Sequence, residues 1–276
     1  MKFSFLKNTF LILLASILIF NLAACGKTTT SEKKELKVGT SPGPYSELFK
    51  TGVKPILEKE GYKVTLVNFS NLLQADIALT EGSIDFNVDQ HTAYVNSFNK
   101  EKKANLVPII HIPSVPAGIF SNKYNSIDQV KDGAKIAIPQ DPSNASRAFN
   151  LLQKAGWIKL KDGINPITVT KNDIAENPHK LDITLMDSAQ IPRAMDDIDY
   201  GVLPGSIVYA AHIDPKKSLL SETLVKDLEI TVVVDEKNKD TKWAKAISDA
   251  YRSKEFKDYL TKLGQDNYWY VPDSLK

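Results

Sequence analysis

One arginine is placed where it could bind a carboxylate. Arg147 lies early in an expected helix that follows an expected strand over Lys135–Ile138. Asp141 suits the N-cap of that helix, and Pro142 suits its first position. Free backbone N–H groups and the helix dipole favour an anion at such an end, and a guanidinium there could hold a carboxylate through two parallel hydrogen bonds. The competing interpretation is a surface arginine, because most arginines are exposed.

The sequence contains no recognisable catalytic or metal-binding set. It has neither a Gly-x-Ser-x-Gly turn nor a Gly-rich phosphate loop, and none of its four histidines has the spacing of a zinc motif. Scattered histidines could still form a zinc site, but surface or structural histidines are the commoner case. We therefore expect no enzyme activity, no cofactor and no metal. The histidines are His91, His111, His179 and His212.

A second candidate for chemistry is Cys25, the one cysteine in the chain. It follows Leu22-Ala23-Ala24 and an apolar run from Phe10 that is too short for a membrane span, which needs about 20 residues. The pattern is typical of a bacterial lipoprotein signal, whose cysteine thiol accepts a diacylglyceryl group. An ordinary signal peptide that happens to contain cysteine is the alternative. We expect removal of residues 1–24 and a lipid anchor on the extracytoplasmic face of the cell membrane.

Composition and charge narrow the possible functions. The chain has 276 residues, 42% hydrophobic and 25% charged, which is ordinary for a soluble globular protein. Its net charge of +2 disappears with Lys2 and Lys7 of the signal, and no basic cluster is interleaved with aromatics. Nucleic-acid binding therefore has little support. Residues 25–35 are polar and should form a flexible tether.

Beyond the tether, short strands alternate with helices. Strands are expected at 36–39, 63–68, 84–88, 106–112, 117–121, 135–138, 167–170, 183–185, 200–203 and 228–234. Helices are expected at 44–60, 72–80, 91–102, 142–155, 189–196 and 243–263, the last broken near Ser253. This alternation predicts an α/β protein with a mostly parallel sheet covered on both faces. In such proteins, ligands bind beyond the carboxyl ends of the strands or between domains.

Several long sequence segments indicate a resemblance to one family. They are Lys37–Pro44, Ala78–Asp85, Gln90-His91, Ile138–Asn144, Arg147-Ala148, Leu151–Gly156, Asp173–Pro178 and Ala189–Ala194. In order and spacing they resemble the NlpA/MetQ family, the methionine-binding lipoproteins of ABC importers, over essentially the whole mature chain. The resemblance implies a two-lobed periplasmic-binding-protein-like fold of type 2, with a ligand cleft and two crossover segments. Lobe 1 would comprise residues 36–118 plus 232–276, and lobe 2 residues 119–231.

The resemblance also implies a function. The protein would be a monomeric, lipid-anchored binding protein that delivers an amino acid or small peptide-like ligand to an ABC permease with a separate ATPase. Arg147 becomes the expected clamp for the ligand carboxylate, and His91, Asn87 and Asn144 become polar groups of the cleft, with loop capping as their competing role. The rival hypothesis is an adhesin-type surface lipoprotein on the same fold with lost or changed ligand binding. A neighbouring permease and ATPase gene pair would favour the importer.

The sequence departs from the family pattern at expected ligand contacts. The changed positions are Tyr45, Val88, Asp89, Pro204, Ser206 and Glu229, where the family carries a histidine, aromatics or asparagines. Asp89 and Glu229 could place two carboxylates opposite Arg147, which favours a zwitterion with an extra amine over methionine. Alternatively, Glu229 caps a loop and the cleft still takes methionine.

Overall fold

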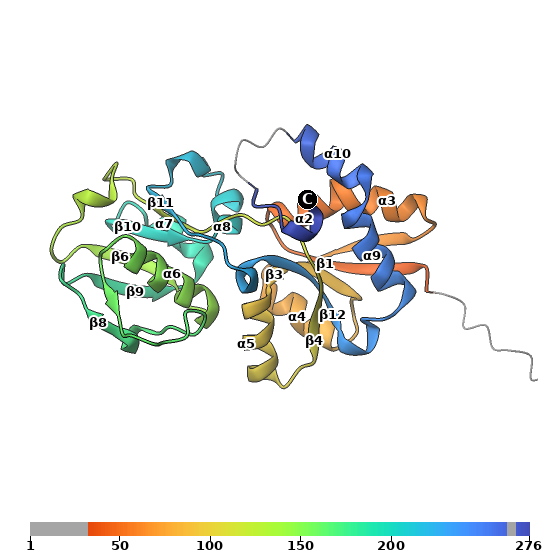
Figure 1. The fold of residues 1–276 in the computed structure, drawn as a ribbon, viewed down its shortest axis with the longest axis horizontal. Coiled ribbons are helices and arrows are strands. Elements are labelled where there is room, and N and C mark those ends of the chain that lie inside the picture. Colours follow the sequence, from red (N-terminus) through yellow and green to blue (C-terminus); the bar gives the residue numbers. More distant parts are fainter. Residues whose placement is uncertain (1–32, 264–268) are drawn as a thin grey trace, which may run out of the picture. The chain divides into compact units, whose positions relative to one another are not determined.

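The protein forms two lobes, each built on its own five-stranded sheet (Figure 1). The structure is a computed structural model, and it describes residues 33–263 and 269–276. The signal over residues 1–24, Cys25 and most of the tether lie outside the described residues. The chain passes between the sheets twice, through residues 112–117 and 222–229.

The first lobe contains the sheet with strand order β2-β1-β3-β12-β4. Its strands are β1 (Glu35–Thr40), β2 (Lys63–Asn68), β3 (Phe86–His91), β4 (Leu106–His111) and β12 (Ile230–Asp235). Its helices are α2 (Pro44–Leu48), α3 (Lys54–Lys59), α4 (Leu72–Thr80), α5 (Thr92–Lys102), α9 (Lys242–Arg252) and α10 (Lys254–Lys262). A π-helical turn over Phe49–Val53 joins α2 to α3. Helical connections return the chain to the same edge, so β1 runs parallel to β2 and β3.

The second lobe contains the sheet with strand order β11-β5-β10-β6-β9. Its strands are β5 (Gly118–Phe120), β6 (Lys135–Pro139), β9 (Asp182–Met186), β10 (Tyr200–Leu203) and β11 (Leu220–Ser221). Its helices are α6 (Pro142–Lys154), α7 (Ile191–Ala194) and α8 (Gly205–Ala210). A two-stranded ribbon pairs β7 (Lys159–Leu160) with β8 (Ile174–Glu176).

Each lobe has its own hydrophobic core. In the first lobe, the fully buried ring of Phe86 on β3 packs edge-on against Phe49, with ring centroids 5.4 Å apart, and lies 6.4 Å from Trp243 of α9. In the second lobe, Trp157 packs against Tyr200 of β10 at 4.6 Å and donates its indole N–H to the Ile127 carbonyl. The two aromatic clusters hold β3 and β10 in place, and polar residues lie at the carboxyl ends of strands in both sheets.

Two expectations about strands are wrong. The sheets are mixed rather than mostly parallel, because β12 runs antiparallel to β3 and β4, and β5 runs antiparallel to β10 and β11. Both β5 and β12 enter their sheets directly from a crossover segment. Residues 167–170 form no strand. Ser146 of α6 instead holds that segment, because its hydroxyl donates to the Pro166 carbonyl and accepts from the Val169 N–H.

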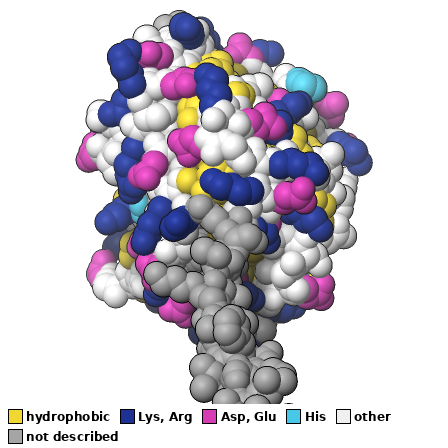
Figure 2. Space-filling view, turned by 90° about the vertical axis from the view of Figure 1, so that its right-hand side faces the viewer, with side chains coloured by type: hydrophobic (Ala, Val, Ile, Leu, Met, Phe, Trp, Pro, Cys, Tyr) yellow, Lys and Arg dark blue, Asp and Glu magenta, His cyan; other side chains and the backbone are white. Residues whose placement is uncertain are grey.

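The absence of a basic cluster in the sequence is matched by the surface on the face shown in Figure 2. On the face shown in Figure 2, basic and acidic side chains are interspersed among the described residues. That face therefore offers no broad basic patch of the kind that binds nucleic acid.

Candidate ligand-binding site

A cavity of about 460 Å³ is lined by residues of both lobes. Ser41 follows β1 and Asp89 lies near the end of β3, whereas Gln140 follows β6 and Pro204 follows β10. The lining thus comes from the carboxyl ends of strands in both sheets, where α/β folds generally bind ligands. Its volume falls within the roughly 300–1,000 Å³ that is typical of small-molecule sites.

Arg147 is held in this cavity by the start of α6. Asp141 caps the helix by accepting from the Asn144 N–H at 3.0 Å, and Pro142 occupies the first turn. This local geometry places Arg147 one turn into the helix, with only 7% of its surface exposed. The predicted helix start at Asp141-Pro142 is therefore confirmed, and the competing interpretation of Arg147 as a surface residue is wrong.

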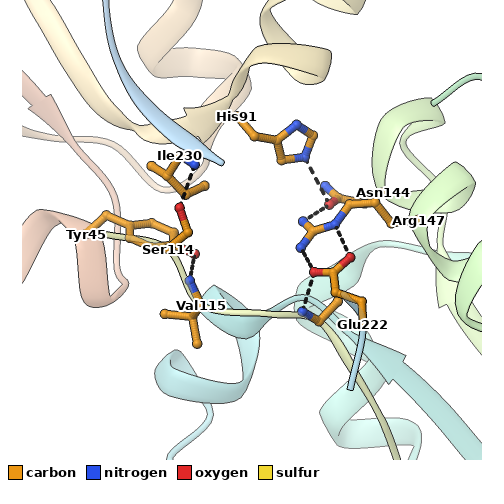
Figure 3. Close-up of polar contacts among 9 residues, drawn as sticks. Tyr45, His91, Ser114, Val115, Asn144, Arg147, Glu222 and Ile230 are labelled. Atoms are coloured by element: carbon orange, nitrogen blue, oxygen red, sulfur yellow. Dashed lines mark hydrogen bonds and ion pairs between the residues drawn. The ribbon is translucent and has the colours of Figure 1, made fainter. Parts of the chain in front are cut away.

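The structure adds a carboxylate partner for Arg147 that the sequence did not indicate. Glu222, on the second crossover, accepts from Nε of Arg147 at 3.1 Å and from Nη2, and its Oε1 also accepts from the Ala117 N–H (Figure 3). Burial lowers the pKa of Arg147, but the charge and hydrogen bonds of Glu222 outweigh burial and raise that pKa above its usual value. The guanidinium is therefore permanently charged and rigidly oriented.

Arg147 still has hydrogen-bonding capacity for a ligand. A guanidinium has five N–H donors. In the described part of the chain, two of these donate to Glu222 and a third donates from Nη1 to Asn144 Oδ1 at 2.9 Å. One N–H on Nη1 and one on Nη2 are not used in these hydrogen bonds, so each could donate to a ligand carboxylate.

His91 links the first lobe to this cluster. Its Nδ1 accepts from the Tyr94 N–H at 3.1 Å, so Nε2 carries the proton and donates to Asn144 Oδ1 at 3.4 Å (Figure 3). Burial, together with the positive charge of Arg147, lowers the pKa of His91 to about 3. His91 is therefore a neutral hydrogen-bond donor at physiological pH, and it adds no charge to the cavity.

Asp89 places a carboxylate on the first-lobe side of the cavity. Its Oδ2 accepts from the Ser41 N–H and the Ser41 hydroxyl, both at 2.8 Å, and the Ser46 hydroxyl lies 2.9 Å from both carboxylate oxygens. Burial raises the pKa of Asp89 to about 6, although the serine hydrogen bonds act in the opposite direction. Asp89 is therefore mostly ionised at pH 7.

Comparison with known proteins identifies the family. Residues 36–270 match the NlpA lipoprotein family. The chain belongs to that family. A curated relative, the D-methionine-binding lipoprotein MetQ of Salmonella typhi, is 34% identical over 245 residues, which cover 88% of this chain and 90% of the relative. The resemblance seen in the sequence is thereby confirmed.

Solved structures give the same result for the fold. A nutrient-binding protein from Burkholderia cenocepacia bound to methionine superposes with a TM-score of 0.80 and 37% identity, covering 86% of this chain and 99% of that one. The substrate-binding protein of a methionine transporter from Streptococcus pneumoniae has a TM-score of 0.78 and 27% identity, covering 87% and 96%. The two-lobed α/β fold expected of an NlpA-family chain is confirmed.

The cavity contains most, but not all, of the residues expected there. Six line it: Tyr45, Asp89, His91, Asn144, Arg147 and Ser206. Asn87 lies behind it, where its Nδ2 donates to Asp76 Oδ1 at 2.6 Å. The roles of all eight candidates in binding stay predictions.

Glu229 does not line the cavity. Its Oε1 accepts from the Tyr270 hydroxyl at 3.1 Å, and its Oε2 lies 3.4 Å from Nδ1 of His111. The next residue, Ile230, lines the cavity instead. Because neighbouring residues of an extended chain point to opposite sides, a shift of one position exchanges a carboxylate for an aliphatic side chain. The expected pair of cavity carboxylates, Asp89 and Glu229, is therefore reduced to Asp89.

A buried carboxyl supports the cavity from behind. Asp76 of α4 accepts at Oδ1 from Asn87 and, at 2.8 Å, from Nε2 of Gln90. Burial raises the pKa of Asp76 to about 7, and the two amide hydrogen bonds lower it by less. An aspartate between apolar residues of an expected helix, in Gln74-Ala75-Asp76-Ile77, was the only sign of this group in the sequence.

Asp76 makes folding stability depend on pH. Its folded pKa lies above its unfolded value of 3.8, so the protonated form stabilises the fold at low pH and this contribution is lost as the pH rises through about 7. We expect the group to lower the free energy of unfolding by on the order of 2–3 kcal/mol between pH 5 and pH 8. Asp76→Asn should flatten that dependence, leaving the smaller slope due to Asp89. Urea unfolding at several pH values checks this, and an identical slope in both proteins would contradict it.

No spanning helix or metal cluster is seen in residues 33–263 and 269–276. No helix within these ranges has both the length and the apolar character needed to cross a bilayer. No group of three or more His, Cys, Asp or Glu side chains in the same ranges could hold a metal ion.

Proposed function

We propose that this protein is the extracytoplasmic substrate-binding protein of a methionine-type ABC importer and that it binds an amino acid or small peptide-like ligand between its lobes. The observation that carries the proposal is the cavity to which both lobes contribute, with Arg147 in its lining and two N–H groups of Arg147 not used in the hydrogen bonds to Glu222 and Asn144. Membership of the NlpA family and its methionine-binding relatives support it. The protein acts by binding, and the permease and ATPase are separate partners.

Ligand binding would be coupled to closure through the two crossovers. At the first-lobe end, the Ile112 N–H donates to the Ile230 carbonyl at 2.8 Å. The Ile230 N–H donates to the Ser114 hydroxyl at 2.7 Å (Figure 3). At the second-lobe end, Ala117 and Glu222 exchange hydrogen bonds. Both ends are thus fixed, so bending is expected in the short stretches between them.

The lobe bounds expected from the sequence, 36–118 plus 232–276 and 119–231, differ slightly from the sheets, because Gly118 pairs in the second sheet and Ile230 and Thr231 pair in the first. We propose that lobe 1 comprises residues 36–111 plus 230–276 and lobe 2 residues 118–221, with the two crossovers between them.

A thermal-shift screen tests the proposal. The panel is the twenty amino acids plus methionine- and glycine-containing dipeptides, each at about 1 mM. A ligand with a dissociation constant near 1 μM would add about 4 kcal/mol to the free energy of unfolding, which corresponds to roughly 8–16 °C in Tm for a chain of this size. If no member of the panel shifts Tm, the proposed function is wrong.

We also propose that Cys25 is the mature N-terminus and carries the lipid anchor. This cysteine lies outside the described residues, so the support is the Leu22–Cys25 motif together with membership of a lipoprotein family. Cys25→Ala should stop lipidation, so the protein should leave the membrane fraction or accumulate unprocessed. Cell fractionation with mass spectrometry of the N-terminal peptide measures this. A variant that stays in the membrane with normal processing would refute the anchor.

A further inference from the structure

Two buried oxygen atoms of the first lobe have no hydrogen-bond partner among the described residues. They are Oδ2 of Asp76, on α4, and Oε1 of Gln90, on β3. The two side chains are almost completely buried, and they already share a hydrogen bond from Nε2 of Gln90 to Oδ1 of Asp76 at 2.8 Å. Because buried polar groups are almost always paired and neither atom is accessible, the missing donor must come from the protein itself.

The orientation of the Gln90 amide is fixed by its neighbours. Its Nε2 donates to Oδ1 of Asn87 at 3.0 Å as well as to Asp76, so both amide protons are used. Exchanging the nitrogen and the oxygen would place Oε1 against two acceptors. Asn87 is oriented in the same way, because its Nδ2 donates to Oδ1 of Asp76 at 2.6 Å. A different amide orientation therefore supplies no donor for either unpaired oxygen.

A single proton on Asp76 would satisfy both atoms. A protonated carboxyl has an O–H donor in addition to its acceptor capacity. A proton on Oδ2 would turn one unpaired acceptor into a donor, and Oε1 of Gln90 is the unpaired acceptor on a side chain that Asp76 already binds. A carboxylic acid and a primary amide pair through two antiparallel hydrogen bonds, and the bond from Nε2 to Oδ1 is the first of these.

The charges around Asp76 favour the same protonated form. Burial raises the pKa of Asp76 to about 7, and the negative charge of Asp89 on β3 acts in the same direction. His91 on β3 is neutral, and Tyr94 on α5 is also neutral, because burial and the charge of Asp76 raise its pKa. The charged residues of β1 and β12, which also pack against α4, are exposed or half-buried: Glu35, Lys37 and Asp235. None of these groups offers Asp76 a buried cation.

Asp76 connects two elements that line the ligand cavity. The first turn of α4, at Leu72-Leu73, and the end of β3, Asp89–His91, both belong to the lining. The hydrogen bonds from Asn87 and Gln90 to Asp76 join this part of β3 to the helix (Figure 1). Ionisation would leave Oδ2 and Oε1 unpaired and add a buried charge, so it would weaken that connection.

We propose that Asp76 is a positioning residue that works in its protonated form, donating from Oδ2 to Gln90 and so holding β3 against α4 in the arrangement that binds the ligand. The inference rests on the proposed function and adds that ligand binding is linked to protonation at this site. A bound ligand excludes water from the cavity, which makes a carboxylate behind it still more costly. Binding should therefore take up part of a proton from the buffer near neutral pH, and affinity should fall as Asp76 ionises.

Two substitutions separate the protonated form from the anion. Asp76→Asn places an amide N–H where the acid carries its O–H, whereas Asp76→Leu removes every side-chain hydrogen bond of the group. The probes are L-methionine and the panel member with the largest shift in Tm, titrated calorimetrically at about pH 6.5. We expect Asp76→Asn to bind within about twofold of wild type and Asp76→Leu to bind about fivefold more weakly or worse.

Asp76→Asn should also melt about 4 °C or more above wild type at about pH 8, where wild type has a buried charge. A variant that melts below wild type at this pH, or binds as weakly as Asp76→Leu, would show that the anion is the working form and overturn the inference. The comparison of Tm needs no ligand. It therefore decides the protonation of Asp76 even if the whole panel fails to bind, which is the result that refutes the proposed function.

A pH profile tests the link to binding. Between about pH 6.5 and pH 8.5 the affinity of wild type should fall about threefold or more, because a half-unit rise in the pKa of Asp76 on binding gives that factor. Asp76→Asn should lose most of this dependence, and Asp182→Asn, at an exposed position of the second lobe, should follow wild type. Titrations in phosphate and in Tris should show proton uptake by wild type and far less by Asp76→Asn. Equal pH dependence in wild type and Asp76→Asn would overturn the inference.

Discussion

Arg147→Ala is expected to weaken ligand binding by roughly 30-fold or more, because breaking a buried, hydrogen-bonded charge pair usually costs about 2–5 kcal/mol. Arg147 is the one Lys or Arg among the described residues that line the cavity, and two of its N–H groups are not used in the hydrogen bonds to Glu222 and Asn144. Isothermal titration with the ligand found in the screen measures the effect. Arg147→Lys should also bind weakly, because an ammonium cannot reproduce the planar fork of donors.

Arg147→Ala is also expected to destabilise the fold, so a control variant must separate lost binding from lost stability. The substitution leaves Glu222 buried without its cation, which typically costs about 3–5 kcal/mol of folding stability. The double variant Arg147→Met with Glu222→Gln removes both charges and should recover most of the lost Tm without recovering affinity. An unchanged dissociation constant in that folded double variant would show that Arg147 does not hold the ligand.

Phe86→Ala is expected to lower the free energy of unfolding by about 3–5 kcal/mol, the usual cost of deleting a buried aromatic ring. Phe86 is fully buried between Phe49 and Trp243. Its strand β3 ends at His91 and also carries Asp89. Urea denaturation measures the change. Phe86→Leu, which keeps most of the apolar volume, should cost clearly less. A loss below about 1 kcal/mol for Phe86→Ala would mean that this cluster does not anchor β3.

Local sequence signals predicted the elements that carry the site. The Asp141-Pro142 start and the Gly156 end of α6 follow from capping rules, and Gly156 has the positive φ of 75° that a helix stop requires. Strand β2 and helix α4 have the predicted bounds, Lys63–Asn68 and Leu72–Thr80. These features depend on residues within a few positions of one another, so one sequence is enough to find them.

Contacts between residues far apart in the chain could not be predicted from local sequence signals. Glu222 lies 75 residues from Arg147, and nothing in the Ser221-Glu222-Thr223 segment indicates a buried ion pair. The antiparallel entry of β12 likewise depends on where a crossover returns to the first sheet. Glu229 was assigned to the cleft by its position in the family pattern, but the direction of a side chain depends on register, which a resemblance does not settle to one residue.

The account depends most on an amino-acid-like ligand bound at Arg147 in the cavity between the lobes. Liquid chromatography with mass spectrometry of the small molecules released when the purified protein is denatured tests this directly. After incubation with the amino-acid and dipeptide panel and removal of the unbound excess, wild type should release close to one equivalent of an amino acid or short peptide. The folded variant with Arg147→Met and Glu222→Gln should release far less. Equal recovery from both proteins, or no amino acid or peptide from wild type, would contradict the account.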